Sequence, residues 1–377
     1  MYAIKNVQLV TPTGILQQQA VVCDTKIIAI IQEDQLDPSV AWIDGGGCYL
    51  VPGFIDLHLH GCAGYDVMDE DPLALTEIAK NIVRTGVTAF LPTTMTMEFS
   101  KIIQALERIR RFNNAPDLAR VLGCHLEGPF LSSAYKGAQD EQYFRDPDFE
   151  LIRPYSDLIR IITLAPEKPG SSDFIIECRK QGIIASIGHS NATFEVAKAA
   201  IASGVTYITH TFNAMSPLHH RNPGVVAAAL LDDTVTCELI ADNFHVHPEV
   251  QKLLAKVKGS DRLVLITDAM EACLLGDGNY HLGGQPVVVK NNQARLTNGS
   301  IAGSVLTMNR ALKNMAKNSG LPLWEVVRMT SFNAARLLGL ATKGAIEVGK
   351  DADMVLLDKD FEVVMTLIAG QPVYSRE

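Results

Sequence analysis

Three kinds of segment are missing from this sequence of 377 residues. It has no uninterrupted apolar run of the roughly 18 residues that a membrane span needs, so we expect no membrane partner. Its lysines and arginines form no run dense enough to follow a phosphate backbone, and the formal net charge is -9, so we expect no nucleic-acid partner. The first residues, MYAIKNVQLV, lack the basic and apolar regions of a signal peptide.

Paired cysteines are missing as well. The seven cysteines are scattered, odd in number and form no C-x-x-C motif, which favours reduced thiols and a cytoplasmic location. Apolar residues, in contrast, make up 47% of the chain, which is enough to bury a large core. The length fits one large domain with a smaller one beside it.

The two ends of the chain share one pattern. Residues 1–52 and 352–375 read as short alternating strands, rich in β-branched residues and separated by turn residues. We therefore expect a small β-sandwich domain built from both termini, residues 1–52 and 340–377. The catalytic domain would then span residues 53–339.

The middle of the chain alternates between helical and strand patterns. Segments such as RTGVTAFLPTTM and ASGVTYITHTFN place a glycine where a helix is expected to end and a buried strand to begin. Eight apolar strand candidates follow one another, at residues 54–60, 88–94, 120–127, 159–166, 183–189, 205–211, 237–242 and 263–268. Helices between buried strands imply parallel βαβ units, so the fold class is α/β and eight units predict a TIM-like (β/α)8 barrel. An open doubly wound sheet is the alternative, but no G-x-G-x-x-G follows the first strand to support it.

Polar residues recur at one end of these strands. The two histidines of GFIDLHLHG are two residues apart on a strand, so their side chains share a face. The residues at the carboxyl ends, where a barrel places its active site, are His58, His60, Glu127, His189, His210, His245 and Asp268. Imidazole and carboxylate groups suit zinc or iron(II). A single histidine is more often a hydrogen-bonded loop residue, but the whole ring favours a metal site.

The positions suggest how such ions would be held. His58 and His60 would hold one ion and His189 and His210 another, with Glu127 bridging the two. Asp268 would act as acid and base beside a metal-bound water, because a metal lowers the pKa of that water toward ~7.

Several segments carry a resemblance. H-x-H on the first strand, two later histidines and an aspartate on the eighth strand resemble the amidohydrolase superfamily. Within it, the chain is similar to N-acetylglucosamine-6-phosphate deacetylases over essentially its whole length, in PGFIDLHLHG, HLEGPF, LAPE, GHSNAT, THTFNAM, NPG and LITDAM. The resemblance implies hydrolysis of N-acetyl-D-glucosamine 6-phosphate to D-glucosamine 6-phosphate and acetate, with a metal-bound hydroxide attacking the acetamide carbonyl.

The resemblance also implies roles for individual residues. Glu127, His189 and His210 resemble the principal metal ligands of the family, and the resemblance implies either one ion or two, the second held by His58 and His60. Zn²⁺ is the expected metal, with Fe²⁺ next. Asp268 would be general base, then general acid to the leaving nitrogen. The expected substrate-binding residues are Gln139, Asn213, Ala214, Arg221 and His245. Gln139 stands where the family often has a histidine, and Arg221 and His245 imply a site shared across a homodimer.

Three alternatives stay open. The first is the same reaction on N-acetyl-D-galactosamine 6-phosphate, which shares the acetamide and the phosphate. The second is another amidohydrolase, many of which bridge two ions with a lysine on the fourth strand; residues 159–166 have none at their end, which leaves Glu127 as the bridge. The third is a non-catalytic sugar-phosphate-binding barrel, which should have lost one of these ligands or Asp268.

Overall fold

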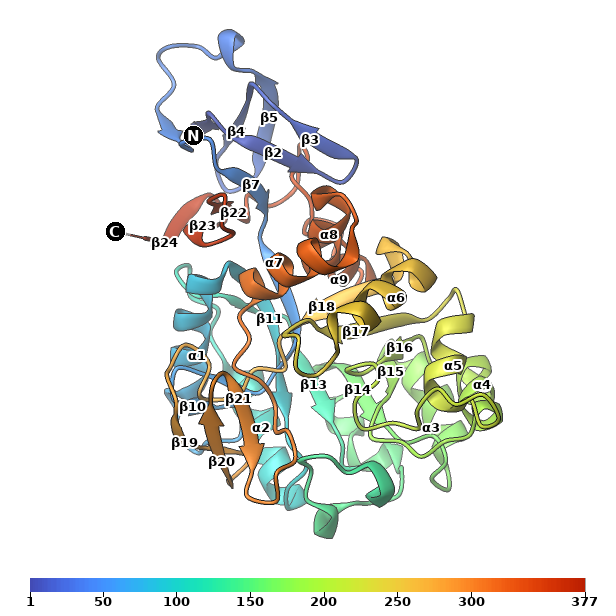
Figure 1. Ribbon diagram of the computed structural model, residues 1–377. Helices are drawn as coiled ribbons and strands as arrows, with labels where there is room; N and C mark the ends of the chain where they lie inside the picture. Colours follow the sequence, from blue (N-terminus) through green and yellow to red (C-terminus); the bar gives the residue numbers. More distant parts are fainter. Residues whose placement is uncertain (377) are drawn as a thin grey trace.

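The computed structural model describes residues 1–376, and its centre is a barrel of parallel strands (Figure 1). The neighbouring strands pair in parallel from the first to the last. They are β8 (Phe54–Leu59), β11 (Val87–Thr94), β13 (Cys124–Glu127), β14 (Ile159–Leu164), β15 (Ile184–Ile187), β16 (Tyr207–Ile208), β17 (Thr236–Ile240) and β18 (Leu263–Ile266). The predicted barrel is confirmed.

The barrel closes through side chains as well as backbone. The carboxylate of buried Asp56 on β8 accepts a hydrogen bond from the Thr267 hydroxyl at 2.5 Å, just beyond β18. The amide of Asp268 donates to the carbonyl of His58 at 2.9 Å. This seam brings the ends of the first and last strands together, and with them His58 and Asp268.

Two strands are shorter than the sequence predicts. The segment 205–211 pairs only over β16, and the segment 120–127 is divided into β12 (Arg120–Val121) and β13. Gly123 at this break has a φ of 129° and its Cα lies against Arg160 and the carbonyl of Leu158, so the chain bends where a side chain would clash.

Helices cover the outside of the barrel. They are α1 (Ala74–Ile82), α2 (Phe99–Arg111), α3 (Ser171–Lys180), α4 (Phe194–Ser203), α5 (Gly224–Leu231), α6 (Pro248–Lys258), α7 (Met308–Ser319), α8 (Leu323–Thr330) and α9 (Phe332–Leu337). Gly86 and Gly204, with φ of 86° and 134°, make the predicted turns from helix to strand. The connection from β13 to β14 carries short 3₁₀ turns instead of an α-helix, and it supplies Tyr135, Lys136 and Gln139 to the barrel mouth.

The chain ends form two sheets at one end of the molecule (Figure 1). One sheet contains β1 (Tyr2–Lys5), β4 (Gln19–Cys23), β5 (Ile27–Gln32) and β6 (Trp42–Asp44). The other contains β2 (Gln8–Thr11), β3 (Gly14–Leu16), β7 (Tyr49–Pro52), β22 (Met354–Leu357), β23 (Val363–Ile368) and β24 (Gln371–Ser375). Ile4, Leu9, Val21, Met354 and Leu367 share one buried cluster between them, which confirms the small sandwich from both termini. The boundaries at 52 and 340 stay a prediction.

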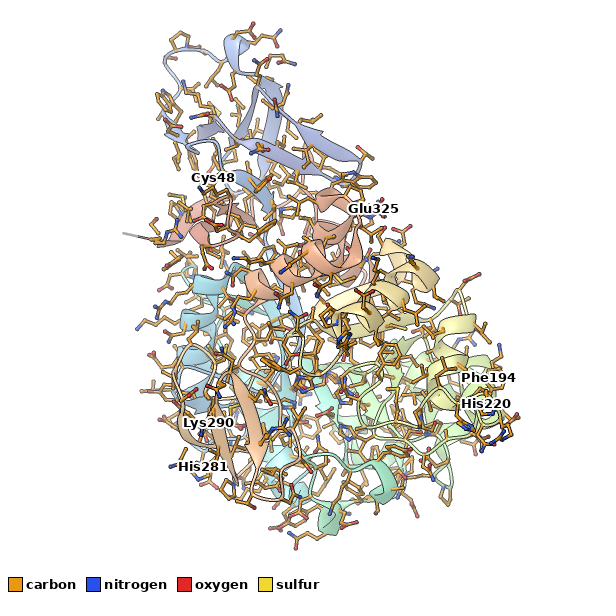
Figure 2. The ribbon with its side chains drawn as sticks, viewed as in Figure 1. Cys48, Phe194, His220, His281, Lys290 and Glu325 are labelled. Carbon is orange, nitrogen blue, oxygen red and sulfur yellow. The ribbon has the colours of Figure 1, made fainter. Side chains whose placement is uncertain are left out.

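A further sheet follows the last barrel strand. It consists of β19 (Gly278–Leu282), β20 (Gln285–Lys290) and β21 (Gln293–Leu296). Figure 2 shows its exposed edge, where His281 and Lys290 project. Its flanking residues reach the barrel mouth, so this insertion forms one wall of the site. No helix within residues 1–376 is long and apolar enough to cross a membrane.

Candidate active site

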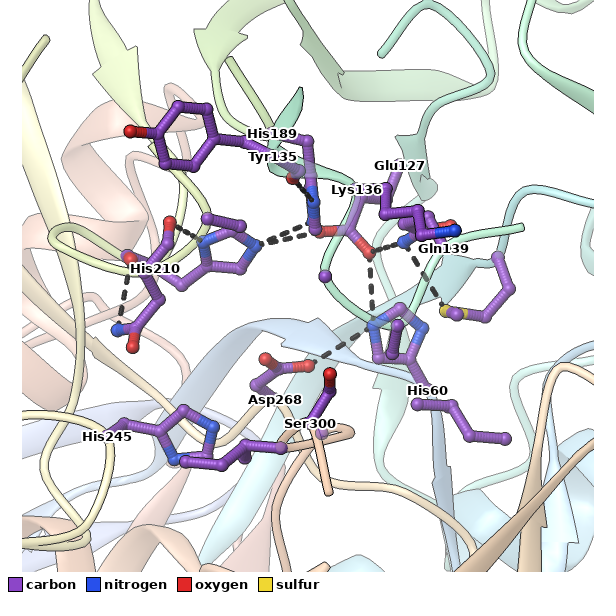
Figure 3. A pocket seen from close by; sticks show the side chains of 18 of the residues that line it. His60, Glu127, Tyr135, Lys136, Gln139, His189, His210, His245, Asp268 and Ser300 are labelled. Carbon is purple, nitrogen blue, oxygen red and sulfur yellow. Dashed lines mark hydrogen bonds and ion pairs between the residues drawn. The ribbon is translucent and has the colours of Figure 1, made fainter. Parts of the chain in front are cut away.

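A cavity of about 530 Å³ opens at the carboxyl ends of the barrel strands (Figure 3). Most of the predicted site residues line it: His60, Glu127, Gln139, His189, His210, Asn213, Ala214, His245 and Asp268. His58 lies fully buried directly beneath them. Arg221 is exposed and does not line this cavity.

The backbone at several of these residues is strained. His189, His210 and Asp268 have positive φ angles of 49°, 29° and 50°. Such angles are costly for residues with a side chain and are kept where the surroundings enforce them, often at functional sites. Each of these residues lies two positions beyond the end of a barrel strand, and its side chain lines the cavity at the barrel mouth.

One pair of histidines meets the first oxygen of Glu127. Oε1 of Glu127 lies 3.2 Å from Nε2 of His189 and 3.1 Å from Nε2 of His210. The two Nε2 atoms are 3.1 Å apart. The three side chains form the first group in the site that fits a metal ion.

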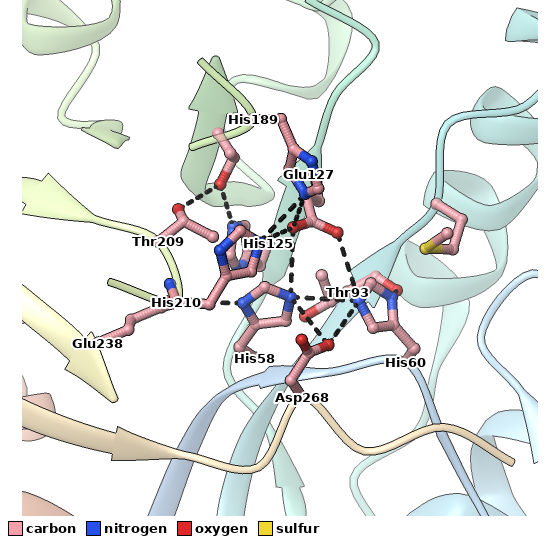
Figure 4. A network of polar contacts seen from close by, with 12 residues as sticks. His58, His60, Thr93, His125, Glu127, His189, Thr209, His210, Glu238 and Asp268 are labelled. Atoms are coloured by element: carbon pink, nitrogen blue, oxygen red, sulfur yellow. Dashed lines mark hydrogen bonds and ion pairs between the residues drawn. The ribbon is translucent and has the colours of Figure 1, made fainter. Parts of the chain in front are cut away.

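The other pair of histidines lies on the far side of the same carboxylate, where His60 faces Oε2 and Nε2 of His58 lies 3.6 Å from Oε1. Nε2 of His60 lies 3.3 Å from Oε2 of Glu127 and 3.1 Å from Nε2 of His58. Oδ1 of Asp268 lies 3.2 Å from Nε2 of His60 (Figure 4). The carboxylate therefore sits between two pairs of imidazoles, as expected of a bridging ligand. The lysine that follows strand four, Lys168, pairs instead with Asp146 at 3.0 Å.

Each of the four imidazoles is held through its Nδ1 atom, which leaves Nε2 facing the cluster. Nδ1 of His60, His189 and His210 contacts the backbone carbonyls of Thr93, Tyr135 and Asn213, respectively, at 3.0–3.2 Å. Nδ1 of His58 contacts the carboxylate of Glu238 at 3.0 Å. These oxygens accept hydrogen bonds, so Nδ1 carries the hydrogen in each neutral ring and Nε2 offers its lone pair to the centre. Four converging lone pairs with two carboxylates fit divalent metal ions.

A third possible group, His58 with His125 and Glu238, does not fit an ion. Both nitrogens of His125 are already bonded, Nδ1 to the carbonyl of Leu57 at 3.1 Å and Nε2 to the hydroxyl of Thr163 at 2.7 Å. Burial lowers the pKa of His125 well below its usual range, and the nearby His58 lowers it further. His125 is thus a neutral imidazole that packs edge-on against His58, with ring centroids 4.6 Å apart.

Charges of opposite sign face one another across the cluster. Burial opposes a charge on His60, but Asp268 and Glu127 outweigh that effect and raise its pKa to about 9. Burial likewise acts to raise the pKa of Asp268, but His58 and His60 lower it to about 2. Asp268 is therefore ionised and able to accept a proton over a wide pH range.

We expect metal binding to release protons. Because the pKa of His60 is about 9, its Nε2 carries a proton near neutral pH that a divalent ion must displace. The affinity for this ion therefore rises with pH and levels off above about 9. Calorimetric titration of the apoprotein with Zn²⁺ in two buffers of different ionisation enthalpy measures the released protons. Equal binding enthalpies in both buffers would contradict this expectation.

Four of the five predicted substrate-binding residues line the cavity, and they make different contacts. Asn213 and Ala214 border the cavity beside His210. His245 is held by Asp242, whose carboxylate contacts its Nδ1 at 2.6 Å. Gln139 donates from Nε2 to Oε2 of Glu127 at 2.7 Å and accepts from the amide of Thr96 at 2.8 Å. The Gln139 side chain is thus engaged with the Glu127 carboxylate.

Arg221 lies apart from the cavity of its own chain. Its guanidinium contacts the ring of His220 at 2.7 Å. Figure 2 shows His220 at the outer rim of the molecule in this view. In the described chain, Arg221 therefore makes no contribution to the lining of the cavity.

Some residues of the site are not predicted by the sequence patterns. Lys136, Asn298 and Ser300 line the cavity from loops, and no strand pattern marks them. Glu238 could have been predicted, because it is the one charged residue within the buried strand TCELI. A carboxylate in such a strand needs a buried partner, and here the partner is His58.

Comparisons with known proteins agree with the geometry. The model of the amidohydrolase family matches residues 49–373. An N-acetylglucosamine-6-phosphate deacetylase from Lysinibacillus sphaericus is 41% identical, over 98% of this chain and 96% of the relative. An N-acetylgalactosamine-6-phosphate deacetylase from Escherichia coli O157:H7 is 39% identical, over 85% and 87%. The crystal structure of N-acetylglucosamine-6-phosphate deacetylase from Pasteurella multocida superposes with a TM-score of 0.94 at 34% identity, covering 100% of both chains.

The barrel and its histidine–carboxylate cluster define a hydrolase of the divalent-metal-dependent amidohydrolase class. Within that class, the chain belongs to the family of the N-acetylglucosamine-6-phosphate deacetylases. This membership also argues against the non-catalytic alternative, since the expected ligands and Asp268 are all in place.

Proposed function

We propose that this enzyme hydrolyses the acetamide of N-acetyl-D-glucosamine 6-phosphate, giving D-glucosamine 6-phosphate and acetate. The observation that carries the proposal is the convergence of four imidazole Nε2 atoms on Glu127, with Asp268 beside them, at the floor of one cavity. The activity named for the relatives from Lysinibacillus sphaericus and Pasteurella multocida supports the choice of substrate.

We propose two ions of Zn²⁺, with Fe²⁺ as the alternative. His189 and His210 would hold one, His58 and His60 the other, and Glu127 would use one oxygen for each. When bound, the metal lowers the pKa of water and polarises the acetamide carbonyl. The histidines contribute by keeping their Nδ1 atoms bonded to fixed oxygens, so little reorganisation is needed.

Asp268 would move the proton. It is ionised, buried within the cluster and faces the cavity, so it can accept a proton from the attacking water. It would then deliver that proton to the acetamide nitrogen, because an amine leaves poorly unless it is protonated. The strained backbone of Asp268 holds the carboxylate in place for both transfers.

The sugar phosphate would be oriented by residues above the cluster. Asn213, the backbone of Ala214 and His245 line the cavity and would contact the sugar or its phosphate. Asp242 keeps the His245 ring in a fixed orientation. We propose that Gln139 acts mainly on Glu127, because its amide nitrogen is already bonded to that carboxylate.

We propose a homodimer in which Arg221 binds the phosphate in the partner's cavity. The prediction is complementation between two inactive proteins, one with Arg221→Ala and one with Asp268→Asn. In a mixed dimer, the subunit that keeps Asp268 receives an intact Arg221 from its partner, so one site in two becomes complete. Turnover at low substrate concentration should reappear on mixing and subunit exchange. No recovery in verified mixed dimers would place Arg221 elsewhere.

N-acetyl-D-galactosamine 6-phosphate is the second candidate substrate, because the relative from Escherichia coli O157:H7 is named for it. Acetate release from both sugar phosphates, measured side by side as kcat/KM, tests the proposal. A higher value for the gluco sugar supports it, and a higher value for the galacto sugar replaces the substrate but keeps the chemistry. We place the reaction in the cytoplasm, consistent with seven free cysteines.

A further inference from the structure

His58 differs from the other three imidazoles in what holds it. Backbone carbonyls accept the Nδ1 hydrogen of His60, His189 and His210. For His58 the acceptor is a carboxylate, Oε2 of Glu238, at 3.0 Å (Figure 4). A carboxylate in this position makes the imidazole a stronger ligand than a neutral carbonyl does.

Glu238 is buried in a way that demands a compensating positive charge. Its side chain is 0% exposed, and Oε2 accepts from Nδ1 of His58 and from the backbone amide of His210 at 2.9 Å. Its other oxygen, Oε1, has no hydrogen-bond partner within residues 1–376. Burying a carboxylate beside neutral donors alone is costly, so the charge must be balanced through His58.

We infer that Glu238 is a positioning residue that makes His58 a metal ligand and thereby secures the second ion. Glu127, Asp268 and Glu238 are three carboxylates around one cluster. With neutral imidazoles, one divalent ion leaves these three carboxylates with a net charge of −1, and a second ion brings the net charge to +1. Glu238 itself is fully buried behind the imidazole and does not line the cavity.

This inference rests on the proposed two-ion site, and Glu238→Gln tests it without removing the hydrogen bonds. The amide oxygen of glutamine can take the place of Oε2, while its NH₂ group replaces the oxygen that has no partner. The variant therefore removes the charge alone. Glu238→Ala removes the hydrogen bonds as well and serves as a second variant.

The experiment counts bound Zn²⁺ per chain and measures the two dissociation constants by chelator competition. We expect Glu238→Gln to weaken the affinity for the second Zn²⁺ ion by about 10- to 100-fold and to leave the affinity for the first unchanged. Glu238→Ala should weaken the second ion at least as much. Glu249→Gln is the matched control, because it makes the same substitution at an exposed position on α6 outside the cavity. Both constants should stay normal in this control.

A double variant separates positioning from general damage. If Glu238 acts through His58, then Glu238→Gln should have no further effect on Zn²⁺ binding in a His58→Ala background. The inference is overturned if Glu238→Gln binds both Zn²⁺ ions as tightly as the wild type. It is also overturned if the affinities for the two ions fall equally. A wild type that deacetylates with a single ion overturns it too, yet keeps the proposed function. A wild type that releases no acetate from either sugar phosphate instead refutes the function.

Discussion

Asp268→Asn is expected to lower kcat by about 10²- to 10⁴-fold, the usual range for loss of a general acid–base group. Asparagine keeps the shape of the side chain but cannot accept a proton from water or deliver one to the leaving nitrogen. Because Oδ1 of Asp268 lies at the edge of the cluster, 3.2 Å from Nε2 of His60 and 3.5 Å from Nε2 of His58, we expect metal content and substrate affinity to persist.

Steady-state kinetics, metal analysis and binding of substrate to the inactive variant check this expectation. Asp117→Asn is a suitable control, because Asp117 is exposed and lies outside the cavity. Near-normal kcat for Asp268→Asn would remove Asp268 from the proton transfer. Loss of bound metal in this variant would show that Asp268 acts mainly as a metal ligand.

Glu127→Gln is expected to have the larger effect, with loss of both ions and a fall in kcat/KM on the order of 10⁴-fold or more, equal to several kcal/mol. Both Glu127 oxygens are used, Oε1 toward His189 and His210 and Oε2 toward His60. Glutamine would offer one oxygen and turn an amide NH₂ group toward the other ion, so the bridge fails electrostatically as well as geometrically.

Metal content by elemental analysis and acetate release measured on the same sample check the second expectation. Glu195→Gln, at an exposed position at the start of α4, is the control. If Glu127→Gln keeps two ions per chain, the bridging role is wrong. If it keeps one, Glu127 belongs to a single ion.

Much of this arrangement could be predicted because barrel geometry is regular. Eight apolar segments in parallel order fix where strands end, and strand ends fix which side chains meet. His58, His60, Glu127, His189, His210 and Asp268 therefore converge although they are spread over more than 200 positions. The position of each of these residues relative to the end of its strand can be read directly from the sequence.

Other features depend on contacts that no local pattern reveals. The partner of Glu238 lies 180 positions away along the chain, so its role became visible only when β8 and β17 were placed in the same barrel. The neutral state of His125 follows from its burial and from the nearby His58, which both lower its pKa. Leu57 and Thr163 occupy its two ring nitrogens. The wall formed by β19–β21 is an insertion into the barrel, and barrel periodicity does not predict insertions.

The most direct test of the account is a titration of metal-free enzyme with Zn²⁺, following acetate release from N-acetyl-D-glucosamine 6-phosphate. We predict negligible activity in the chelated protein and a rise that reaches its plateau at two equivalents per chain. Full activity with no bound metal would contradict the account at its centre.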